Sequence, residues 1–102
     1  MSHHTTTETD VKIEEILSHI SENSWMNIVD LEGWAAGITD NAESAEEWCK
    51  RNASPAAHYF KAWELGTNEA SKMLSYFSKF SMPTCPGSSS AGKFFYTYKF
   101  SI

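Results

Sequence analysis

The sequence predicts a single, mainly α-helical domain that ends in a small β element. The 102 residues are the length of one domain, and a hydrophobic content of 41% with 14% aromatic residues can supply its core. Apolar residues recur at helical spacing along most of residues 10–80. The final ten residues, KFFYTYKFSI, alternate strictly between two faces, as a strand does. Residues 1–9 are polar and threonine-rich, which predicts a disordered tail before a domain of residues 10–102.

Three helices are expected in the first half of the chain, at residues 10–22, 28–36 and 42–51. In the first helix, Asp10 is a favourable N-cap and the isoleucines share one face. The second segment suits either a short helix or a short strand, and its glycines weaken a long helix; we favour the helix. The third helix follows Asp40 or Asn41, either of which can cap it.

Two further helices are expected on either side of a very short break. Ser54-Pro55, an N-cap followed by proline at the first helical position, predicts a helix over 55–65. Gly66 ends that helix, and Thr67 is a suitable cap for the next helix, over 68–80. A break this short lets the second helix cross the first at a steep angle.

The alternating segment 94–100 is the only clearly predicted strand, and a lone strand needs a partner. A strand within 81–86 would supply one and complete a hairpin. Helix, short break, helix and hairpin is the order of elements in a winged helix-turn-helix, in which the second helix enters the DNA major groove and the hairpin is the wing. We therefore expect a winged helix-turn-helix, with the helix-turn-helix at 55–80, the wing at 81–102 and an N-terminal helical extension.

Charge is divided unevenly along the chain, whose net charge is −5. Residues 1–49 hold eleven acidic residues and one lysine, whereas residues 50–102 hold seven basic and two acidic residues. This polarity indicates an anionic partner for the basic half, although charges also cluster on solvated faces that bind nothing. The expected organisation is a set of acidic N-terminal helices at 10–40 and a basic DNA-binding half at 41–102.

The helix over 68–80 carries the residues expected to read double-stranded DNA. Asn68, Lys72, Ser75 and Lys79 share one face, opposite an apolar stripe. Asparagine can pair with adenine, and lysine can reach guanine or phosphate. An ordinary solvated face of an amphipathic helix is the alternative. The candidate DNA-binding residues are Thr67, Asn68, Glu69, Ser71, Lys72, Ser75, Lys79, Lys93, Lys99 and Arg51.

Residues 45–80 have further features in common with a known group of proteins. These are Trp48, Cys49, Asn52, Ala57, Phe60, Leu65, Ala70-Ser71 and Leu74-Ser75-Tyr76-Phe77. The stretch is similar to the helix-turn-helix core of the CaiF/GrlA family of bacterial transcriptional regulators. The resemblance implies a small cytoplasmic DNA-binding activator, and it leaves the acidic residues before position 40 without a counterpart.

A second hypothesis from another class is a small acidic protein that binds another protein. Phage inhibitors, immunity proteins and DNA mimics of this kind present acidic residues, here within 8–47, to a basic protein partner. The two hypotheses differ in the surface charge that they require. A DNA reader needs its basic residues on one side, whereas an acidic inhibitor needs an array of carboxylates with its lysines dispersed.

The sequence contains no motif that indicates an enzyme, a cofactor or a metal site. Cys49 and Cys85 lie 36 positions apart, which fits neither a disulfide framework nor a zinc site, and both are expected to be reduced packing residues. No apolar run is long enough to span a membrane, and the N-terminus lacks the features of a secretory signal, so we expect a cytoplasmic protein. The narrow isoleucine and leucine stripe of helix 10–22 predicts a homodimer.

Overall fold

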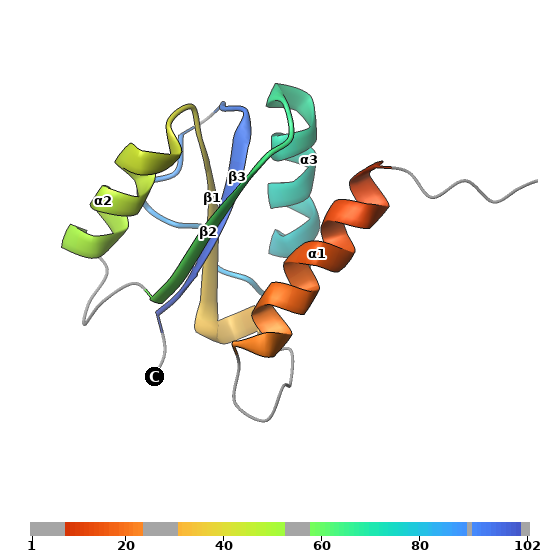
Figure 1. The fold of residues 1–102 in the computed structure, drawn as a ribbon, viewed down its shortest axis with the longest axis horizontal. Coiled ribbons are helices and arrows are strands. Elements are labelled where there is room, and N and C mark those ends of the chain that lie inside the picture. Colours follow the sequence, from red (N-terminus) through yellow and green to blue (C-terminus); the bar gives the residue numbers. More distant parts are fainter. Residues whose placement is uncertain (1–7, 24–30, 53–57, 90, 101–102) are drawn as a thin grey trace, which may run out of the picture. The chain divides into compact units, whose positions relative to one another are not determined.

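A computed structural model of the protein describes residues 8–23, 31–52, 58–89 and 91–100 (Figure 1). The chain divides into two units, residues 1–30 and 31–102. The described part of the first unit is helix α1, Glu8–Glu22. The expected helix over 10–22 is thus confirmed, and it begins two residues before Asp10. Most of the expected tail at 1–9 lies outside the described residues, while Glu8 and Thr9 belong to α1.

The second unit is a small α+β domain built on a three-stranded antiparallel sheet. Its strands have the order β1-β3-β2, so the last strand of the sequence lies in the middle. Within its described residues, two α-helices and a short 3-10 helix accompany the sheet. The elements are η2 (Leu31–Gly33), β1 (Trp34–Thr39), α2 (Ala42–Asn52), β2 (His58–Glu64), α3 (Thr67–Ser78) and β3 (Phe94–Lys99).

Helices α2 and α3 cover opposite faces of this sheet (Figure 1). On one face, Cys49 of α2 packs in a buried cluster with Tyr96 and Tyr98 of β3. On the other face, Phe77 of α3 stacks on Phe95 of β3 with 5.6 Å between the ring centroids. The alternating side chains of β3 therefore supply the apolar contacts for both helices, as a strand covered on two sides must.

The outer edge of β1 is hydrogen-bonded by the chain that follows α3. Ala36 donates its N–H to the Pro83 carbonyl at 3.0 Å and accepts the Cys85 N–H at 2.7 Å. Further along, Ile38 donates to Ser88 Oγ at 2.9 Å, and its carbonyl accepts the Ser89 N–H at 2.9 Å. Residues 83–89 thus run beside β1 and fix one wall of the region described below.

The expected mainly α winged helix-turn-helix is wrong, because the predicted helix over 55–65 is strand β2. Ser54-Pro55, the expected start of that helix, lies outside the described residues. Tyrosine, phenylalanine and tryptophan favour strands, and Trp63 of β2 pairs with Phe95 of β3. Tertiary pairing therefore overrides the helical spacing. The element directly before α3 is strand β2, so these two elements do not form a helix-turn-helix.

The predicted helix at 28–36 and the predicted hairpin are also wrong. The described part of that helix is the 3-10 turn η2 followed by β1, whose residues are nearly all buried. The predicted wing strand within 81–86 does not pair with β3. It instead makes one parallel bridge to β1, between Thr84 and Ala36, while β3 pairs with β1 and β2.

The other predicted elements are confirmed. Helix α2 matches the helix expected at 42–51, and Asn41 is its cap, since Asn41 Oδ1 accepts the Ser44 N–H at 3.0 Å. Helix α3 and strand β3 match the elements expected at 68–80 and 94–100. Across the described ranges, no helix combines the length and the hydropathy that a membrane span needs.

Candidate functional site

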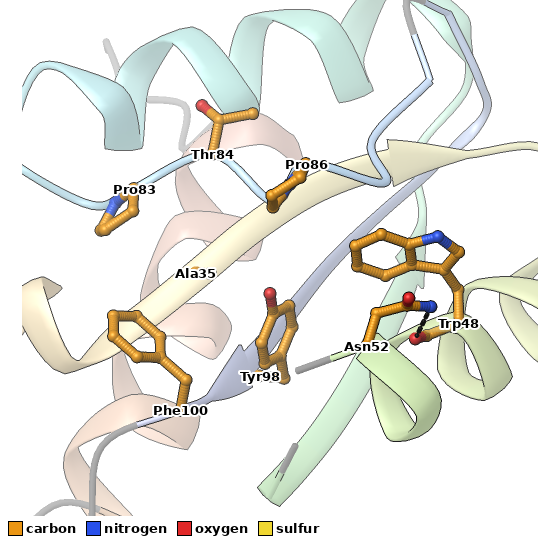
Figure 2. Close-up of a pocket in the computed structure, with 8 residues that line it drawn as sticks. All are labelled: Ala35, Trp48, Asn52, Pro83, Thr84, Pro86, Tyr98 and Phe100. Carbon is orange, nitrogen blue, oxygen red and sulfur yellow. Dashed lines mark hydrogen bonds between the residues drawn. The ribbon is translucent and has the colours of Figure 1, made fainter. Parts of the chain in front are cut away.

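A groove lies on the α2 side of the sheet, between the end of α2 and residues 83–86 (Figure 2). Its volume is about 350 Å³, which is within the range of ligand pockets in proteins. Aromatic and proline side chains dominate its lining. The lining residues are Ala35, Trp48, Asn52, Pro83, Thr84, Pro86, Tyr98 and Phe100.

The period of helix α2 and the alternation of strand β3 explain why four side chains from these elements line the groove together. Trp48 and Asn52 are one helical turn apart, and Asn52 Nδ2 donates to the Trp48 carbonyl at 2.9 Å. Tyr98 and Phe100 are two residues apart and so point to the same side. Phe100 also donates its N–H to the Gly33 carbonyl at 3.1 Å, which continues the pairing one residue beyond β3.

The opposite wall consists of Pro83, Thr84 and Pro86 (Figure 2). These side chains are exposed, while the backbone between them is held to β1 by the hydrogen bonds of Ala36. Figure 2 shows the rings of Trp48, Tyr98 and Phe100 on the side facing this wall. Three aromatic rings therefore face two proline rings across an open groove.

A buried thiol and phenol cluster adjoins the groove. It contains Cys49 from α2, Cys85 from between the two groove prolines, and Tyr96 and Tyr98 from β3. The two thiols are hydrogen-bonded to each other, and both tyrosine hydroxyls donate to Cys85 Sγ. Tyr98 belongs both to this cluster and to the lining of the groove.

The hydrogen bonds of the cluster shift the pKa values of its two thiols in opposite directions. The Cys49 thiol, followed by the two tyrosine hydroxyls and the Gly87 N–H, lowers the pKa of Cys85, although burial opposes this. The same thiol–thiol hydrogen bond, together with burial, raises the pKa of Cys49. Burial, then the hydrogen bond to Cys85, raises the pKa of both Tyr96 and Tyr98. Cys85 is thus the thiol of the pair that ionises first.

The residues predicted to read DNA on α3 share the exposed side of that helix. Asn68, Lys72, Ser75 and Lys79 are all exposed, as is Thr67 at the first position of the helix. The half-buried Glu69 and Ser71 flank them. The N-cap residue is Gly66, not Thr67, and no side chain caps the helix. Helix α3 is therefore amphipathic, as the sequence predicts, but it is not part of a helix-turn-helix.

The remaining predicted DNA contacts are spread over the second unit. Lys93 lies near the start of α3, because its carbonyl accepts the N–H groups of Leu65 and Gly66. Lys99 is at the other end of β3, roughly 20 Å away at about 3.3 Å per residue. Arg51 is on α2, which covers the opposite face of the sheet from α3. The structure thus brings Lys93 to the α3 surface but not Arg51 or Lys99.

Most of the basic side chains are also close to a carboxylate. Among the described residues, pairs within 3.6 Å of a glutamate oxygen are formed by Lys12, Lys50, Arg51, Lys72 and Lys93. Lys72, at the centre of the predicted DNA-reading face, pairs with Glu69 at 3.6 Å, and Lys93 pairs with Glu64 at 3.6 Å. Exposed pairs of this kind contribute little to stability, but they reduce the positive potential of the surface.

No motif in the sequence indicates the groove. Trp48 lies on the helix predicted at 42–51 but is only half-buried, and Pro83 and Pro86, which follow the helix predicted at 68–80, form a wall. The groove residues come from four separate segments, so no local pattern connects them. The two prolines three positions apart and the aromatic run after position 93 are the only hints in the sequence.

No group of three His, Cys, Asp or Glu side chains that could hold a metal ion occurs among the residues that the structure describes. Comparisons of the chain with protein-family models, with curated proteins and with solved structures find no match.

Proposed function

We propose that the protein is a non-enzymatic binding module that holds an extended, proline-containing, basic segment of a partner protein in the groove. The observation that carries this proposal is the convergence of Trp48, Tyr98 and Phe100 on one side of a groove of about 350 Å³. It keeps the basic protein partner of the second hypothesis but not its acidic surface at 8–47, because all the groove residues except Ala35 lie outside that segment.

The chemistry of the groove suits an extended peptide better than a small polar molecule. Apolar rings dominate its lining, and aromatic grooves accept proline-rich segments because the polyproline II helix is already extended and loses little entropy on binding. Trp48 is half-buried, so its ring retains accessible surface for a ligand. Asn52 and Thr84, both exposed, offer polar groups at the rim.

The charge of the helix beside the groove favours a basic ligand over an acidic one. Residues 31–102, which form the groove, hold seven acidic and seven basic residues, so the net charge of −5 lies in residues 1–30. Helix α2, which supplies Trp48 and Asn52, also carries Glu43, Glu46 and Glu47. Because Lys50 and Arg51 pair with the latter two glutamates, the charge of this helix is reduced but stays negative.

Calorimetry with two designed peptides tests the proposal. In the first peptide, leucine and proline alternate between terminal arginines; in the second, glutamates replace the arginines. We expect the arginine peptide to bind more tightly, and its affinity to fall with added salt. Trp48→Ala should weaken binding at least tenfold, as loss of a central aromatic contact costs about 2 kcal/mol or more.

Phe80→Ala is the matched control, since Phe80 is an aromatic residue that is 54% exposed beyond the end of α3, away from the groove lining. It should leave the affinity unchanged, and circular dichroism should show both variants folded. Equal losses in the two variants, or no binding of either peptide to the wild-type protein, would refute the proposal.

Duplex DNA binding by the outer face of α3 is the second candidate function. Its support is the shared exposure of Asn68, Lys72, Ser75 and Lys79, with Lys93 close to the start of the helix. Fluorescence anisotropy with random-sequence duplex DNA at low salt tests it. Binding that Lys72→Ala with Lys79→Ala abolishes, and that Trp48→Ala leaves intact, would favour this candidate over the peptide groove.

A further inference from the structure

The cluster beside the groove brings together two cysteines that are 36 positions apart in the chain. Cys49 is fully buried in α2, and Cys85 is 2% exposed in the segment that runs along β1. Neither residue is bonded in a disulfide, and their thiols hydrogen-bond to each other. The two thiols therefore meet in one buried cluster, from two different elements of the fold.

Cys85 has more hydrogen-bond donors around its sulfur than a packing thiol needs. Cys49 Sγ, the hydroxyls of Tyr96 and Tyr98, and the Gly87 N–H all approach it. Each of these bonds is stronger to a thiolate than to a neutral thiol, and thiolates are the form that reacts with oxidants. A buried thiol that served only to fill space would need none of them.

We propose that Cys49 and Cys85 form a dithiol that a hydroperoxide oxidises to an intramolecular disulfide. The proposal does not depend on the function of the groove. The Cys85 thiolate attacks one oxygen of hydrogen peroxide, the O–O bond breaks, and the departing hydroxide takes up a proton to form water. Cys85 is then a sulfenic acid.

In the second step, the Cys49 sulfur gives up its proton and attacks the Cys85 sulfur. The S–O bond breaks and the second oxygen leaves as water. Overall, two thiols lose two protons and two electrons, and one hydrogen peroxide is reduced to two waters. The tyrosine hydroxyls stabilise the initial thiolate, and Cys49 resolves the sulfenic acid.

The location of Cys85 selects a small oxidant. Its sulfur is buried, but its chain neighbours Thr84, Pro86 and Gly87 are exposed, so a local opening of this turn gives access to a molecule the size of water. An S–S bond of about 2 Å then forms as the two side chains rotate toward each other.

Peroxide titration of the reduced, full-length protein tests the proposal. We expect both thiols to disappear together, the mass of the monomer to fall by two hydrogens, and a proteolytic digest to contain a peptide pair joined through Cys49 and Cys85. A reductant should reverse the change. At pH 6 the native protein should react at least about tenfold faster than the same chain unfolded in guanidinium, because an ordinary thiol is hardly ionised there.

Two variants separate the roles of the thiols. Cys49→Ser should leave a sulfenic acid at Cys85, measured as a mass gain of one oxygen, whereas Cys85→Ser should leave Cys49 unreactive. Equal rates for native and unfolded wild-type chains, disulfides formed only between molecules, or a Cys85→Ser variant as reactive as the wild type would each overturn the proposal. If a variant does not fold, the comparison of oxidation rates between the native and the unfolded wild-type chain still tests the proposal.

Discussion

Phe77 of α3 and Phe95 of β3 are both fully enclosed, and their rings stack with an angle of 24° between the planes. Phe95 also contacts Trp63 of β2, with 6.2 Å between the ring centroids. One side chain on the central strand thus joins a helix to a neighbouring strand. The packing around Phe95 is apolar. The next residue on the same face of β3 is Thr97, a buried polar residue.

Replacing Thr97 by valine should leave the protein as stable as the wild type or more stable, by up to about 1 kcal/mol. Thr97 is fully buried, and its hydroxyl has no hydrogen-bond partner among the described residues. Valine has the same shape without the polar oxygen. Urea unfolding measures the effect, with Thr97→Ala as the control, which should be destabilised because it leaves a cavity. A valine variant that loses more than about 1 kcal/mol would indicate a hydrogen bond to this hydroxyl.

The stability of the protein should decline as the pH rises above the ordinary pKa values of cysteine and tyrosine, 9.0 and 10.0. Cys49, Tyr96 and Tyr98 all have raised pKa values in the folded state, so the unfolded chain loses their protons first. The stabilisation that these three groups contribute is fully present below their pKa values in the unfolded chain, and it is lost as the pH rises above them. Thermal melts across this range measure the decline.

Tyr98→Phe is the control for the pH dependence, since it removes one of the titrating groups while keeping the ring. Its melting temperature should fall less steeply with alkaline pH than that of the wild type. Parallel curves for the two proteins would show that Tyr98 titrates normally. Tyr96→Phe should behave in the same way, because burial raises its pKa as well.

Alanine substitutions at two glycines should differ in cost. At Gly92 a Cβ would lie 2.5 Å from the Thr39 carbonyl carbon, and this backbone cannot move without disturbing β1. At Gly66 a Cβ meets nothing within 4 Å, but φ is +91°, which L residues adopt at a cost of about 1 kcal/mol. Urea unfolding should therefore show a larger loss for Gly92→Ala. The reverse order would contradict the close approach of Gly92 to β1.

The sequence predicts α3 and β3 because the apolar residues of each recur with a clear period. It fails at β2 for a physical reason. Strand β2 has a bulge between His58 and Lys61, with Tyr59 at a φ of 55°, and this shifts the alternation of its side chains. The resulting spacing of aromatic residues matches a helix as well as a strand. Only the pairing with β3, some thirty residues later, resolves the ambiguity.

The candidate site was less predictable than the fold. The chain brings Trp48, Pro86 and Tyr98 together through contacts between α2, the edge of β1 and the end of β3. No single segment holds more than a few of these residues, so a scan of local patterns assigns each to a core or a turn. By contrast, the exposed face of α3 is a local property, and the sequence located its residues correctly.

The central position of β3 has a consequence for folding. Strands β1 and β2 both pair with β3 and not with each other, and Trp34 pairs with Lys99 across 65 positions of sequence. Nucleation of the sheet therefore requires closure of long loops, which slows folding relative to helical domains of the same size. A nascent or truncated chain that lacks Phe94–Lys99 has two strands with no common partner. The final strand thus makes formation of the sheet an all-or-none event.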